Sequence, residues 1–73
     1  MERDAFDRWC NGGKLEGVDY ALAAKVVVLE GDHSGEAGAV ISLQSLAPEP
    51  LYAIELTSGE TVGALQSSLR PDV

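Results

Sequence analysis

The chain has 73 residues, 45% of them hydrophobic, a single cysteine and a net charge of −7 at pH 7. This length and hydrophobic content predict one folded domain over residues 1–73 with one small core, and they exclude a disordered chain. The single cysteine excludes a disulfide within the monomer. The lone thiol, the lack of an apolar run of roughly 20 residues and the lack of a signal-peptide pattern lead us to expect a cytoplasmic protein.

Residues 1–13 predict a short helix with its C-terminal cap. Phe6, Trp9 and Cys10 fall at positions i, i+3 and i+4, which places them on one face. Asn11-Gly12-Gly13 is expected to end the helix, because these residues accept the left-handed conformation of a cap. So short a helix must dock its apolar face. Phe6 and Trp9 therefore either seal the helix against the domain or form a self-association face of a homo-oligomer.

Residues 14–23 show no periodicity and predict a connector. Beyond it, short runs of β-branched or alternating residues are separated by glycine and proline, which is typical of a small barrel and not of alternating strands and helices. One tight helical turn is expected before the last extended piece. The strands are expected at residues 25–30, 39–44, 51–56, 61–65 and around Arg70.

A glycine pattern lies within residues 25–43: Val26-x-Val28, then Gly31-x-x-x-Gly35-x-x-Gly38-x-Val40. It is similar to the KOW motif of small SH3-like barrels in transcription and ribosomal proteins, and the resemblance covers about residues 24–71. In a tight loop, such glycines take backbone angles that other residues rarely adopt. We therefore expect a mainly β fold, an SH3-like five-stranded barrel over residues 24–73 with a short N-terminal helix.

The resemblance also implies contact with RNA or with a partner protein through this loop. In KOW-type domains the residue before the second loop glycine is usually basic, whereas here it is Ser34, between Asp32 and Glu36. Residues 26–73 hold seven acidic residues and one arginine, a balance of −6. Since nucleic-acid affinity depends on lysine and arginine neutralising phosphates, we expect a protein partner with a basic surface and not nucleic acid. With no apolar run of spanning length, we expect no membrane partner either. A KOW-type RNA- or ribosome-associated domain remains the alternative.

No catalytic pattern is present, and we expect neither an enzyme nor a cofactor. Cys10 and His33 are the only residues of their types, and their spacing does not predict a thiol–imidazole pair. Oxygen-bearing side chains at alternate positions of residues 30–36 resemble the start of an EF-hand loop, but its twelfth position is Ile41 where a glutamate should close the calcium shell. A metal-binding protein using this acidic loop is the second alternative.

The candidate partner-binding residues are polar loop side chains and tyrosines. Tyrosine combines an apolar ring with a polar tip and is common in recognition surfaces. Tyr52 alternates with Ile54 and Leu56, which favours a place in the core, whereas Tyr20 fits a groove or an anchor equally well. The candidates are Tyr20, Asp32, His33, Glu36 and Tyr52.

Overall fold

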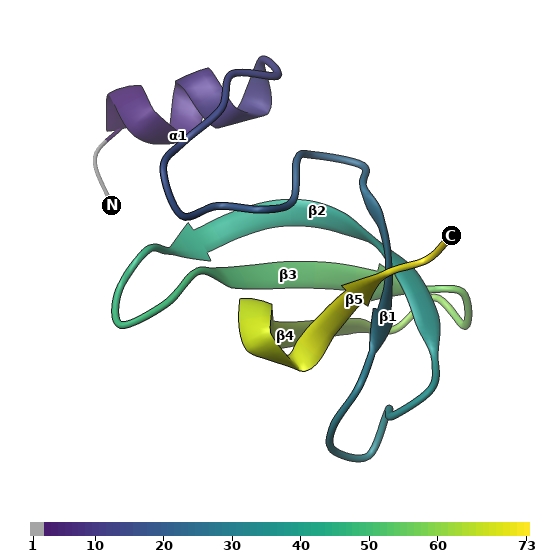
Figure 1. Ribbon diagram of the computed structural model, residues 1–73. Coiled ribbons are helices and arrows are strands. Elements are labelled where there is room, and N and C mark those ends of the chain that lie inside the picture. The colour runs from purple at the N-terminus through teal and green to yellow at the C-terminus, as the bar shows by residue number, and fades with distance from the viewer. Residues whose placement is uncertain (1–2) are drawn as a thin grey trace.

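The structure is a computed structural model that describes residues 3–73, and residues 1–2 of the expected helix lie outside that range. The fold is mostly β, with one short helix and a five-stranded antiparallel sheet, as the sequence predicts. Figure 1 shows the helix beside the curved sheet. The elements are α1 Arg3–Cys10, β1 Lys25–Val28, β2 Ala37–Ser45, β3 Leu51–Leu56, β4 Thr61–Leu65, the 3₁₀ turn η1 Gln66–Ser68, and β5 Leu69–Pro71.

Helix α1 is held to the domain through Trp9. Its side chain is only 1% exposed, and the indole Nε1 donates a hydrogen bond of 2.8 Å to the carbonyl of Tyr20 in the connector. The helix ends as the glycine pair predicts: Gly12 has a φ of 85°, and the Gly13 N–H donates to the Arg8 carbonyl at 2.8 Å. In Figure 1 the connector passes between α1 and the sheet.

The strands follow the order β4-β3-β2-β1-β5, so β1 pairs with both β2 and β5. The longest strand, β2, has two register shifts against β3, one between Val40 and Ser42 and one between Leu43 and Ser45. Each such bulge bends a strand and increases its twist. Figure 1 shows the resulting curvature of β2, which wraps the sheet around its core.

The expected closed barrel is not observed, because β4 and β5 stand at the two ends of an open sheet. Strand β5 has three residues and pairs with β1 along its whole length. It includes Pro71, which has no N–H to donate. So short a strand offers few backbone groups to a second neighbour, and the sheet stays open among the residues that the structure describes.

The glycines of the KOW-like pattern have two different roles. Gly31 and Gly35 have φ values of 84° and 87°, which fit the expected turn conformations. Gly38 differs, since it is absent from the positive-φ residues. A Cβ there would lie 2.6 Å from the Glu55 carbonyl oxygen of β3. Gly38 is therefore required by the close approach of two strands and not by a bend.

One hydrophobic core lies on the inner face of the curved sheet. The side chains come from every strand and from α1, which accounts for the docking of the helix. None of the buried residues in the described range is charged or polar. The core residues are Trp9, Val26, Val28, Val40, Leu43, Tyr52, Ile54, Leu56, Ala64 and Leu69.

Candidate functional site

The acidic loop between β1 and β2, residues 29–36, is a compact turn. The Val28 N–H donates to the Glu36 carbonyl at 2.9 Å, and the Gly35 N–H donates to the Val28 carbonyl at 2.7 Å. The Ser34 hydroxyl donates to the Leu29 carbonyl at 3.0 Å. These bonds close the base of the loop immediately after Val28, so β1 ends two residues earlier than the sequence predicts.

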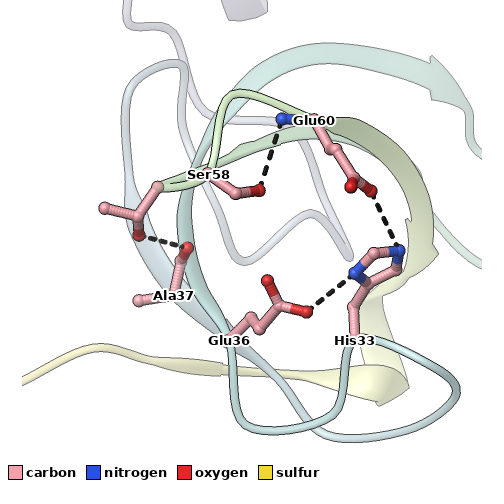
Figure 2. Close-up of polar contacts among 6 residues, drawn as sticks. His33, Glu36, Ala37, Ser58 and Glu60 are labelled. Carbon is pink, nitrogen blue, oxygen red and sulfur yellow. Dashed lines mark hydrogen bonds and ion pairs between the residues drawn. The ribbon is translucent and has the colours of Figure 1, made fainter.

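His33 joins this loop to the turn between β3 and β4. Its Nδ1 lies 2.8 Å from a carboxylate oxygen of Glu36, and its Nε2 lies 3.4 Å from a carboxylate oxygen of Glu60 (Figure 2). Both ring nitrogens can donate only when the imidazole is protonated. The hydrogen bond to Glu36 is the main cause that raises the pKa of His33, and the charges of Glu36, Glu60 and Asp32 act in the same direction against partial burial.

A groove of about 350 Å³ lies between the acidic loop and β4. One wall consists of Glu30, Gly31, Asp32 and His33, and none of the lining residues is a lysine or an arginine. The opposite wall is apolar and comes from β4, with Val28 and Ser68 completing the lining. The residues of the β4 wall are Val62, Gly63, Ala64 and Leu65. Two of the predicted residues, Asp32 and His33, thus line this groove, and Glu36 contacts His33 without being one of the lining residues.

The two tyrosines lie together elsewhere. Their rings meet edge to face with centroids 5.6 Å apart. Tyr52 is fully buried and Tyr20 is half-buried, and burial raises the pKa of both phenols. The Tyr20 hydroxyl donates to the Leu69 carbonyl at 3.3 Å. Tyr20 also lines a separate hollow of about 310 Å³ between the connector and the end of α1. The predicted residues therefore divide between two places.

Gln66, which the sequence does not single out, holds the connector to the sheet. Its side-chain oxygen accepts hydrogen bonds from the Asp19 N–H at 2.8 Å and from the Tyr52 hydroxyl at 2.5 Å. Its amide nitrogen donates to the Gly17 carbonyl at 2.9 Å. Its two partners in the connector, Asp19 and Gly17, lie 47 and 49 residues away in the sequence, so no local pattern marks Gln66. The β4 wall was likewise missed because its residues read only as a strand.

The remaining candidates have structural surroundings. Trp9 is buried within the chain, and the half-buried Phe6 packs on it with ring centroids 6.2 Å apart. Cys10 is a half-buried free thiol that packs against the core. Within residues 3–73, no three His, Cys, Asp or Glu side chains are grouped so that they could hold a metal ion. Across the same residues, no helix is both long enough and apolar enough to span a bilayer.

Comparison with protein-family models, with curated proteins and with solved structures gave no match to this chain.

Proposed function

We propose that this chain is a protein-interaction module or accessory subunit, built on an SH3-like five-stranded sheet that is left open, and without catalysis of its own. Its partner is a protein with a basic surface. The observation that carries the proposal is the groove between the acidic loop and β4, which combines an apolar wall with Glu30 and Asp32. Binding sites typically join an apolar surface to a few placed polar groups.

The strand arrangement supports the SH3-like part of the proposal. Five short antiparallel strands form one sheet in which the first strand pairs with the last. The bulged β2 bends that sheet around a single core, and η1 turns the chain from β4 directly into β5. The sheet thus has the strand order and bending expected of an SH3-like barrel, while its end strands β4 and β5 stay unpaired with each other.

Charge supports a protein partner over RNA. Residues 26–73 carry seven acidic residues against Arg70 alone. A phosphate backbone approaching the β1–β2 loop would meet Glu30 and Asp32 with no lysine or arginine among the residues lining the groove. Binding to nucleic acid gains most of its affinity from such cations and the counterions that they release. The glycine loop of the KOW pattern is thus kept here while its usual charge is reversed.

Affinity capture from the native host with two immobilised proteins tests the proposal. One is the wild type, and the other carries Asp32→Asn and Glu60→Gln, which remove two exposed charges beside the groove. We expect a basic protein to be enriched on the wild type, to be depleted on the variant, and to be released by salt because the pairing is electrostatic.

Fluorescence anisotropy with a labelled single-stranded RNA at low salt provides the second arm. The proposal predicts no binding. A salt-sensitive RNA complex would contradict it and favour the KOW-type alternative, and a capture pattern that is identical for wild type and variant would also count against it.

A further inference from the structure

The two edges of the sheet differ in how they are protected. Edge strands carry unpaired backbone groups, and proteins commonly guard them with proline, charged residues or short length. Strand β5 is guarded in all three ways, since it has three residues and two of them are Arg70 and Pro71. Strand β4 has five residues, Thr-Val-Gly-Ala-Leu, with neither proline nor charge. The edge of β4 is therefore the open one.

The hydrogen-bond register shows which β4 groups face outward. The Leu56 N–H donates to the Glu60 carbonyl at one end of the β3–β4 pairing, and the Gln66 N–H donates to the Pro50 carbonyl at the other end. With the observed register, the alternation of antiparallel pairs assigns the β3 bonds to Val62 and Ala64. The N–H and C=O groups of Thr61 and Gly63 then point away from β3. Among the described residues, neither makes a further backbone hydrogen bond.

The open edge borders the groove beside the acidic loop. Val62 and Ala64 turn inward to the core side, whereas Gly63 is exposed and presents no side chain that would block an approaching backbone. Across the groove stand Glu30 and Asp32. An extended chain lying along β4 would thus have backbone partners on one side and carboxylates on the other.

We propose that β4 accepts an extended, lysine- or arginine-bearing segment of another protein as a sixth strand of the sheet. The inference rests on the proposed function and names its site and mode of binding. Backbone bonds to Thr61 and Gly63 supply the ladder, and the carboxylates of Glu30 and Asp32 select basic side chains. A second copy of this chain is a poorer occupant, because its net charge of −7 would meet the same carboxylates.

The test is a titration of the ¹⁵N-labelled full chain with the peptide acetyl-Thr-Lys-Val-Lys-Val-Lys-Thr-amide, followed by amide spectra and hydrogen exchange. We expect the largest shifts at Thr61, Gly63 and the loop residues 30–33, and new exchange protection at Thr61 and Gly63. A peptide with glutamate in place of each lysine should not bind. The Asp32→Asn variant should bind the lysine peptide roughly threefold more weakly, as expected for one exposed charge pair.

Two controls separate strand addition from charge attraction alone. The first is the same lysine peptide with alternate backbone nitrogens methylated, which keeps its charge but cannot donate along one edge; its binding should weaken by about tenfold or more. The second is Gly63→Pro, which removes an outward N–H without removing a bond to β3, and which should have a similar effect. The methylated peptide decides the matter even if that variant does not fold.

Three results would overturn the inference. The first is equal binding of the methylated and unmethylated peptides, and the second is a set of shifts that leaves out β4. The third is exchange protection at Thr61 and Gly63 in the free protein at concentrations where sedimentation shows a dimer, which would assign the edge to a second copy. In the first two cases a basic partner captured in a charge-dependent manner would still support the proposed function, so the two failures are distinguishable.

Discussion

Gln66 illustrates how one side chain fixes the connector in place. Its carbonyl oxygen accepts from Asp19 and Tyr52, and its amide donates to Gly17, so removing the side chain leaves the part-buried Tyr52 hydroxyl without this partner and frees two exposed backbone groups of the connector. We expect Gln66→Ala to lower the free energy of unfolding by about 2 kcal/mol. Urea unfolding followed by Trp9 fluorescence measures the change.

The matched control is Gln44→Ala, because Gln44 is an exposed residue of β2. This change should stay within about 0.5 kcal/mol of the wild type. Equal losses for the two variants would show that the hydrogen bonds of Gln66 do not hold the connector.

His33 gives the protein a pH dependence with a definite sign. Its pKa in the folded chain is raised above the ordinary value of 6.5, mainly by the hydrogen bond to Glu36. The stability that His33 contributes is therefore fully present below about pH 6.5 and is lost as the pH rises through the folded pKa. His33→Gln should remove this dependence, since the chain has no other histidine.

The pKa itself can be read from an NMR titration of the His33 ring protons. We expect a value above 6.5 in the wild type, and a larger fall in Glu36→Gln than in Glu60→Gln, because the contacts are 2.8 Å and 3.4 Å long. A wild-type pKa at or below 6.5 would contradict the arrangement in Figure 2.

At the scale of elements, the contact between β2 and β3 depends on the absence of a side chain at Gly38. An added Cβ would lie 2.6 Å from the backbone oxygen of Glu55, which cannot move without separating the strands. Gly38→Ala should cost about 2–3 kcal/mol of stability. At Gly63 the nearest atom to an added Cβ is a flexible leucine carbon at 3.9 Å.

Gly63→Ala is therefore the control for Gly38→Ala, because Gly63 lies in the same sheet but has room for a Cβ. It should be neutral or stabilising by up to about 1 kcal/mol, because glycine within a strand is entropically unfavourable. Thermal unfolding of both variants provides the comparison. If Gly38→Ala were tolerated as well as Gly63→Ala, the close approach of β2 and β3 would be wrong.

The elements themselves were largely predictable because their signals are local. Alternating residues placed β3 at 51–56 and β4 at 61–65 with the bounds observed, and the Asn-Gly-Gly cap placed the end of α1. The missed boundaries have tertiary causes. Strand β2 begins at Ala37, two residues earlier than expected, where it already pairs with Val27 of β1.

The site was predictable only in part. The sequence identified Asp32, His33 and Glu36 from the composition of one loop, but it could not supply Glu60, which reaches His33 from a different turn. Nor could it show that Tyr20 and Tyr52 would lie away from that loop. Contacts between distant segments follow from the topology of the sheet, and that topology cannot be read from the composition and spacing of a single sequence.

For the whole molecule, the open sheet is the feature on which the proposals depend. The barrel expected from the glycine pattern would have hidden the edge of β4, whereas the order β4-β3-β2-β1-β5 leaves it beside an acidic groove. The sheet curves enough to build a core for a chain of 73 residues but does not close, so β4 remains available for pairing.

Amide hydrogen exchange on the free, monomeric protein tests this claim most directly. The open edge predicts alternation along β4, with slow exchange at Val62 and Ala64, which bond to β3, and fast exchange at Thr61 and Gly63. Slow exchange at all four amides would show that the edge is already paired, which would contradict both the open sheet and the binding mode proposed for it.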